Sequence, residues 1–227
     1  MRLLRNAALF ALTAFPLVSQ AEIVTYEFSA NVWNMFTSQS SPSGYINTTV
    51  TNSSLAGGSI SMGDPVTGRI SFDTSIPASW TSNEGDSKTY TNSVQQLHFQ
   101  FVPSGIQFSN DGSFSYTLVK IPSTTYSFSY VAFGAPSGGN WGNLAFDDWS
   151  GKTPGNLDMP SHLNLGDYSS ANLSYYWHSQ DGGPDLYVDA SLDSLKEVSA
   201  VPEPSQWMLL AAGALLLAGA SRRARRS

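Results

Sequence analysis

The chain has 227 residues and no cysteine, and its 17 acidic and 11 basic residues leave a net charge of −6. This length suffices for one domain with a sizeable core, and the lack of cysteine excludes disulfides, thiol nucleophiles and thiolate metal sites. The acidic balance argues against a nucleic-acid partner, because binding to phosphates requires clustered Lys and Arg.

The first 21 residues have the three parts of a secretory signal peptide. Arg2 and Arg5 form a basic start, residues 7–18 are apolar, and Ser19 and Ala21 are the small residues that precede a cleavage site. The apolar part is too short for an ordinary transmembrane helix. We therefore expect export of the chain and cleavage by signal peptidase after Ala21.

Residues 22–200 form one predicted extracytoplasmic domain. Six of the 11 basic residues and one of the 17 acidic residues lie outside it, so the domain keeps five basic and 16 acidic residues. Its own net charge is therefore near −11. A domain of this charge leaves polycations and Ca²⁺ as plausible partners and disfavours nucleic acid.

Apolar residues in this domain recur with a period of two, which is typical of half-buried strands. Residues 106–118 predict a hairpin around Asn110, Asp111 and Gly112, and residues 173–177 and 186–192 predict a second one with a longer loop. Other alternating segments are residues 24–32, 66–72, 97–101 and 126–130. No amphipathic helical stretch occurs between them. The pattern predicts an all-β fold, an antiparallel β-sandwich or jelly roll.

Two stretches of the domain do not fit this strand pattern. Residues 34–58 are a polar Ser/Thr/Asn run with few apolar anchors, which indicates either an exposed hairpin or a long loop. Residues 135–165 are rich in Gly, Pro and Asp and are predicted to be a long loop. Loops of this length in a compact domain are functional or poorly ordered.

Catalytic motifs are absent from the sequence. It contains neither a G-x-S-x-G nucleophile elbow nor H-E-x-x-H, and its three histidines lie in separate segments. The few glutamates do not suggest the paired carboxylates of a glycosidase. We expect no enzymatic activity and no cofactor, and the enzyme alternative is a polysaccharide hydrolase or lyase with a non-standard site.

Two binding sites are hypotheses for the Gly- and Pro-rich region. Asp147, Asp148 and Asp158 supply oxygen ligands of the kind that Ca²⁺ prefers, although turn-forming aspartates explain the same residues. Trp141 and Trp149 offer rings that stack on sugars, although aromatic residues in a β domain are more often part of the core.

The C-terminal segment, residues 201–227, has the features of a removable membrane anchor. Fourteen residues without charge, 207–220, would span about 21 Å as a helix, which is short of a hydrocarbon core of about 30 Å. A transmembrane helix over about residues 205–221 is therefore predicted to hold the chain only temporarily. Four arginines follow it as a stop-transfer signal on the cytoplasmic side: Arg222, Arg223, Arg225 and Arg226.

Pro202, Glu203 and Pro204 precede this span and form a stiff, non-helical stretch. Pro-Glu-Pro, a short apolar span and an arginine cluster, in this order at the C-terminus, resemble a PEP-CTERM sorting domain. The resemblance covers about 27 residues of 227. It implies an exported Gram-negative envelope protein that exosortase, a membrane protease, cuts near Pro202–Pro204 and passes from an inner-membrane-anchored precursor to the cell surface or matrix.

The combined prediction is a surface or matrix protein with a structural or adhesive role in exopolysaccharide and biofilm. The main alternative is a jelly-roll module that binds carbohydrate or calcium, with extracellular polysaccharide as its partner.

Overall fold

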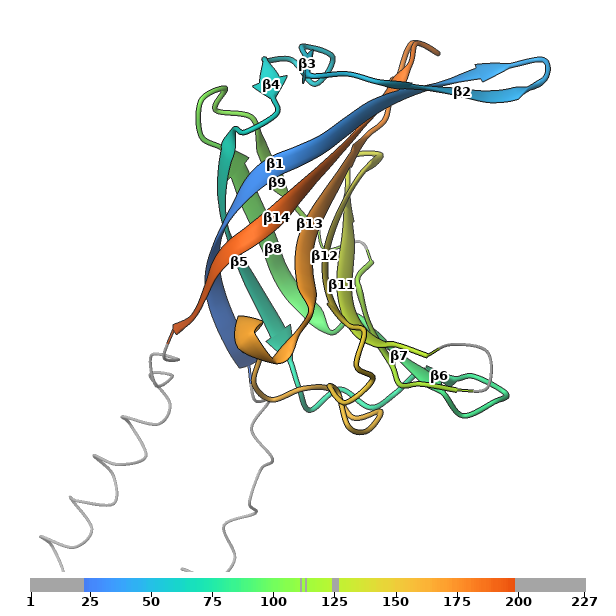
Figure 1. Ribbon diagram of the computed structural model, residues 1–227, viewed down its shortest axis with the longest axis vertical. Coiled ribbons are helices and arrows are strands. Elements are labelled where there is room, and N and C mark those ends of the chain that lie inside the picture. The colour runs from blue at the N-terminus through green and yellow to red at the C-terminus, as the bar shows by residue number, and fades with distance from the viewer. Residues whose placement is uncertain (1–22, 111, 113, 124–126, 199–227) are drawn as a thin grey trace, which may run out of the picture.

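The computed structural model describes residues 23–110, 112, 114–123 and 127–198 (Figure 1). The signal peptide with its cleavage site at Ala21, the sorting motif at residues 202–204, the helix expected over 205–221 and the arginine cluster all lie outside these residues. Among the described residues, no helix is long and apolar enough to cross a membrane.

The regular secondary structure of the described chain is β-strand, apart from one three-residue 3₁₀ turn, η1 (Leu165–Asp167). The all-β prediction is confirmed. The strands are β1 (Ile23–Ser41), β2 (Gly44–Thr49), β3 (Asn52–Ser53), β4 (Ile60–Ser61), β5 (Pro65–Asp73), β6 (Trp80–Thr81), β7 (Ser87–Thr91), β8 (Val94–Phe101), β9 (Gln107–Ser109), β10 (Tyr116–Lys120), β11 (Ser129–Ser137), β12 (Asn140–Asp148), β13 (Ser170–Trp177) and β14 (Asp185–Val198).

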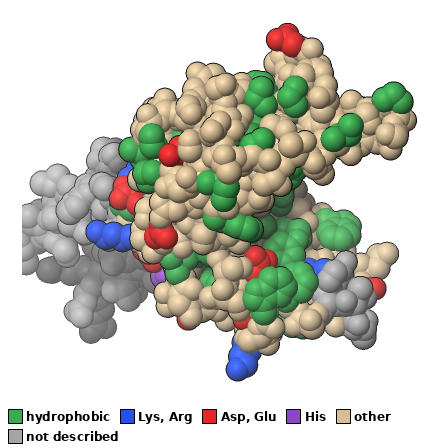
Figure 2. Space-filling model, turned by 45° about the horizontal axis from the view of Figure 1, so that its top comes forward, with side chains coloured by type: hydrophobic (Ala, Val, Ile, Leu, Met, Phe, Trp, Pro, Cys, Tyr) green, Lys and Arg blue, Asp and Glu red, His purple; other side chains and the backbone are tan. Residues whose placement is uncertain are grey.

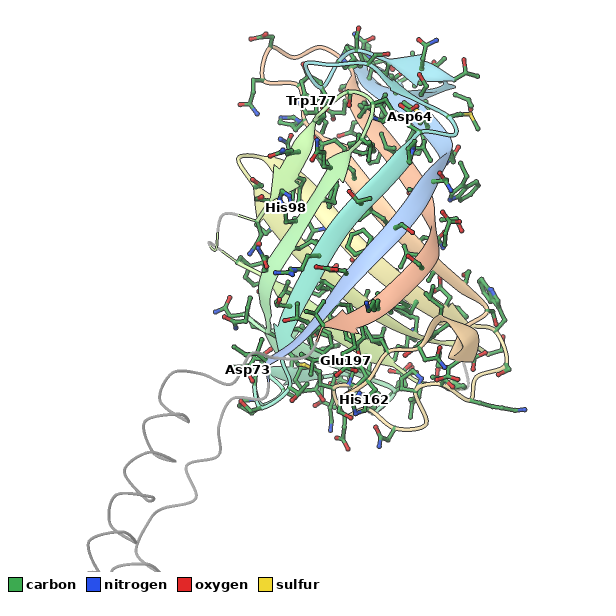
Figure 3. All side chains as sticks on the ribbon, turned by 90° about the vertical axis from the view of Figure 1, so that its left-hand side faces the viewer. Asp64, Asp73, His98, His162, Trp177 and Glu197 are labelled. Atoms are coloured by element: carbon green, nitrogen blue, oxygen red, sulfur yellow. The ribbon has the colours of Figure 1, made fainter. Side chains whose placement is uncertain are left out.

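Twelve of these strands form one antiparallel sheet in the order β6-β7-β10-β11-β12-β13-β14-β1-β5-β8-β9, with β2 paired to β1. The sheet curls strongly, so that strands far apart in this order face one another (Figures 1 and 3). Phe72 of β5 contacts Phe133 of β11 with ring centroids 4.6 Å apart, although four strands lie between them in the sheet. The two packed layers of the predicted sandwich are therefore both parts of a single sheet.

Short links between the two ends of the sheet keep it curled. Only Asn92 and Ser93 separate β7, near one end, from β8, near the other. The buried Ser93 hydroxyl pairs with Thr117 Oγ1 at 2.7 Å, and the Ser115 hydroxyl donates to the carbonyl of Val94 at 2.9 Å. These contacts satisfy polar groups where the ends meet, as buried polar groups require.

The interior is filled by the inward residues of the alternating strands. In β1, Val24, Tyr26, Phe28 and Ala30 are buried and the residues between them are more exposed. Aromatic rings dominate the centre: Phe72, Phe99, Phe101, Phe133 and Phe146 are all fully buried. The strands form because alternate apolar side chains can bury only on a pleated sheet with one covered face.

The predicted hairpin at residues 106–118 is wrong. β9 pairs with β8, whereas β10 pairs with β7 and β11, so the two segments lie toward opposite ends of the sheet order. The turn residue Asn110 is held to β8 instead: its N–H donates to Leu97 O at 3.0 Å, and its Oδ1 accepts from Leu97 N at 2.8 Å. The turn-forming residues predict where the chain changes direction, but the strands that pair afterwards depend on the curvature of the whole sheet.

The long loop predicted over residues 135–165 begins only after Asp148. β11 and β12 form a hairpin whose turn is Gly138–Gly139, both with positive φ. Gly142 lies within β12. Glycine is required there because a Cβ would come within 2.6 Å of the Phe108 ring, which packs on it from the facing layer. The glycine content that predicts a loop here instead reflects a tight turn at Gly138–Gly139 and a close packing contact at Gly142.

The other two local predictions are confirmed. β13 and β14 form the hairpin predicted from residues 173–177 and 186–192. Of the polar run at residues 34–58, residues 36–49 form the exposed hairpin that is one of its two predicted alternatives, through the end of β1 and all of β2, and residues 50–58 follow it as β3 and its flanking turns.

Candidate functional site

Both ends of the described chain leave the domain at the same place. β1 begins at Ile23, and Thr25 pairs with Val198 at the end of β14. Figure 3 shows Asp73, His162 and Glu197 at this end of the domain and Asp64 and Trp177 at the opposite end. We call the first end the base. The sorting segment therefore continues the chain from the base.

Trp141 lies on the outer face of β12 within a row of aromatic residues. Trp141, Tyr176, Tyr187 and Phe36 are register partners on the four neighbouring strands β12, β13, β14 and β1. We call these four residues the outer aromatic row. All are partly exposed. The strands bring them together because adjacent strands lie about 4.8 Å apart and directly opposed side chains share a face.

Three rings of this row contact one another in succession, and the fourth, Trp141, packs on a residue outside the row. Phe36 and Tyr187 have ring centroids 4.5 Å apart and planes 6° apart, and Tyr187 and Tyr176 have centroids 4.7 Å apart. Trp141 stacks on Tyr116 at 5.8 Å. These ring contacts stabilise the pairing of the strands that carry them.

Polar side chains border the outer aromatic row. The Tyr176 hydroxyl donates to Asp185 at 2.8 Å, and burial followed by this hydrogen bond raises the pKa of Tyr176 above its ordinary value. His178 Nδ1 lies 2.9 Å from the same carboxylate. On the other side, Asp189 accepts from Asn34 at 3.0 Å and from Ser174 at 2.8 Å.

Asn143 continues this polar border beside Trp141. Among the described residues, its Oδ1 is the one buried side-chain polar atom without a hydrogen-bond partner. All four strands carry aromatic residues in the sequence, but which of them align depends on strand register, so local patterning does not predict the row.

Trp149 does not belong to the same site as Trp141. It follows the end of β12, eight residues from Trp141, which corresponds to about 26 Å along a strand. Its side chain is 63% exposed and contacts Phe128 at 5.2 Å between ring centroids. Of the two tryptophans proposed to contact sugar, Trp149 has the more accessible ring.

The three aspartates proposed for calcium are not brought together. Asp148 is buried and accepts five hydrogen bonds within its own loop and from Ser169. Asp147 points to the outer face and accepts from Ser170 at 3.2 Å, and burial raises its pKa. Asp158 lies 3.5 Å from Lys88 Nζ. Each carboxylate thus has its own local partner.

No group of three or more His, Asp or Glu side chains within the described ranges is close enough to hold a metal ion. The histidines have separate partners: His98 pairs with Ser109, His162 with Glu197 and His178 with Asp185. A shallow groove of about 350 Å³ lies on the outer face over β1, β5 and β8, and the Arg69–Glu27 ion pair forms part of its lining.

These features define an all-β domain with a C-terminal segment that leaves from its base. Residues 200–226 match the PEP-CTERM protein-sorting motif, so the chain carries this motif, as its resemblance implied. The motif is that of an exported protein which exosortase, a membrane protease, recognises in its membrane-anchored precursor. No curated protein and no solved structure matched the chain.

Proposed function

We propose that this chain is a structural or adhesive protein of a Gram-negative cell surface or extracellular matrix, released from a membrane-anchored precursor by exosortase. The observation that carries the proposal is the sorting motif at residues 200–226, which follows directly from the base of the domain. A domain that leaves the membrane from one end is free to place its other end in the matrix.

Processing at the motif is tested by intact-mass analysis of the chain from a host that contains an exosortase. Glu203→Gln should prevent cleavage, because it removes the single carboxylate between the two prolines. The wild-type chain and the control Glu84→Gln, which changes an exposed loop residue, should both lose the arginine cluster. A mature wild-type chain that still ends after Arg226 would refute sorting by cleavage.

A second proposal, that the domain binds matrix polysaccharide, is supported by the exposed ring of Trp149. Aromatic rings that are open to solvent can take the apolar face of a sugar. Trp149→Ala should abolish binding on a glycan array, and Trp141→Ala should reduce it less because the Trp141 ring already stacks on Tyr116. Trp80→Ala is the control, since Trp80 is also exposed but lies on β6. Equal binding by all variants would rule out this site.

We propose no catalytic role and no cofactor for the domain. The separate pairing of its histidines and the use of Asp148 within its own loop support this. Turnover of a matrix polysaccharide by the purified chain, or a Ca²⁺-dependent rise in its melting temperature, would contradict it.

A further inference from the structure

The hairpin of β1 and β2 projects from the end of the domain opposite the base (Figure 1). β14 follows β1 only as far as the pair Ser38–Asp185, and beyond it β1 pairs with β2 alone. We call residues 38–49 the arm. Every residue of β2 is exposed, with Tyr45 at 77% and Ile46 at 59%. Beyond Ser38, the strands of the arm therefore have no backbone pairing partner in the described domain apart from each other.

The outer edge of β2 has free backbone groups at defined residues. Val50 N–H donates to Met35 O at 3.0 Å, which makes Met35 and Val50 a hydrogen-bonded pair. Such pairs alternate along an antiparallel ladder, so the N–H and C=O groups of Tyr45, Asn47 and Thr49 point away from β1. These three residues form a row of donors and acceptors that can pair with another strand.

The protections that keep exposed edges from pairing are missing here. Natural edge strands are very short, or carry Lys, Pro or a bulge. The two end strands of the large sheet follow this rule, since β6 has two residues and β9 has three. β2 has six residues, Gly-Tyr-Ile-Asn-Thr-Thr, with no charge, no proline and an unbroken register with β1.

Charge decides which partner suits this edge. The sequence has no charged residue from position 28 to position 63, although the domain as a whole is acidic. Two copies would repel each other through most of their surfaces but not through their arms. In Figure 2 much of the visible surface is likewise uncharged, with exposed hydrophobic side chains on it.

We propose that two copies of this chain associate by antiparallel pairing of their β2 edges. The register that forms most hydrogen-bonded pairs places Asn47 opposite Asn47 of the second copy, and Tyr45 opposite Thr49 on both sides. This arrangement is a closed twofold interface. Because each arm lies at the end of its domain opposite the base, pairing of the arms leaves both bases free. One dimer then connects two separate attachment points.

The absence of cysteine makes this register directly testable. In the full chain, Asn47→Cys places two thiols opposite each other, with Cα atoms about 5.5 Å apart, a distance that suits a disulfide. Oxidation should give a covalent dimer on a non-reducing gel. The control Ser43→Cys, equally exposed at the tip of the arm, faces position 51 of the second copy and should stay monomeric. Equal cross-linking of both variants, or of neither, would overturn the proposal.

A charge exchange tests association without a covalent bond. Sedimentation of the wild-type chain should show its mass doubling with concentration, whereas Asn47→Lys and Asn47→Glu should each remain single chains. An equimolar mixture of the two variants should recover the dimer, because unlike charges then face each other. All variants keep residues 199–227, so association through that segment would not depend on position 47. If position 47 has no effect on the mass, the arms do not pair.

Discussion

At the scale of single residues, Asp148 organises the loop that follows β12. Its carboxylate accepts from the backbone N–H groups of Ser150, Lys152 and Thr153 and from the hydroxyls of Ser150 and Ser169, at 2.7 to 3.3 Å. The hydrogen bond from the Ser150 side chain, followed by those from the backbone, holds the pKa of Asp148 well below its ordinary value. The residue that suggested a calcium ligand thus acts as an anchor for its own loop.

The charge of Asp148 should stabilise the fold in a pH-dependent way. Because its pKa is lower in the folded state, its contribution is complete above the ordinary Asp value of about 3.9 and is lost as the pH falls toward the lower folded-state value. Asp148→Asn should therefore lower the melting temperature by several degrees at pH 7. The difference from wild type should shrink below about pH 4.

Circular dichroism melts over this pH range measure the effect, and Asp147→Asn is the matched control. Burial raises the pKa of Asp147, so its charge is not favoured by folding, and its replacement should not lower the melting temperature at pH 7. Equal losses for both variants would show that the hydrogen bonds to Asp148 do not depend on its charge.

At the scale of elements, β1 has one part in the core of the sheet and another in the exposed arm. Its first part pairs with β5 and β14 and buries alternate side chains in the core, whereas its last residues pair with β2 in the exposed arm. Two register shifts against β14, at Ser29–Ala30 and at Val32–Asn34, separate parts of this ladder. Bulges bend a strand and increase its twist, which suits a 19-residue strand that follows a curled sheet.

Because the sheet curls, we expect Phe72 of β5 and Phe133 of β11 to be energetically coupled. Phe72 and Phe133 are fully buried and in contact across the interior. Each change to Ala should lower the free energy of unfolding by about 3–5 kcal/mol. A double-mutant cycle in urea should give a coupling of about 0.5–1.5 kcal/mol, as for other buried aromatic pairs.

The control cycle pairs Phe72 with Phe114, which is 44% exposed and whose ring lies against Tyr116 instead. Its two changes should add without coupling. A Phe72–Phe133 coupling near zero would mean that β5 and β11 do not face each other.

At the scale of the whole molecule, the base and the arm lie at opposite ends. A straight strand as long as β1 would measure about 60 Å, which is the order of the separation between the start of β1 and the tip of the arm. The sorting segment follows from one end, and the surface proposed for self-association is at the other. Removal of the segment therefore leaves the arm unchanged.

The domain should be as stable after processing as before it. β14 is paired with β1 up to Val198, and the core of the described domain is built from residues between Val24 and Leu195. A chain that ends at Ala200 should melt within about a degree of the full chain, since substitutions and deletions away from packed residues change stability little. Thermal melts in the same detergent measure this. A large loss would show that the sorting segment contributes to the fold.

Much of this protein was predictable from local sequence. The alternation in residues 24–32 indicated a strand because a pleated sheet with one covered face requires a period of two. The order of Pro202–Pro204, the apolar span and the arginines indicated a sorting signal, because a linear segment carries it and no folding is needed to recognise it.

Other features depended on pairing between distant residues. The outer aromatic row exists only in the observed register, since a shift of one residue would turn each ring to the opposite face. β9 and β10 separate although a good turn lies between them, because the curled sheet offers each a better partner. By itself the sequence determined the all-β class and the route of export, both of which are encoded locally. The strand order and the exposure of the arm were decided by the tertiary structure, because each depends on which distant strands share their hydrogen bonds.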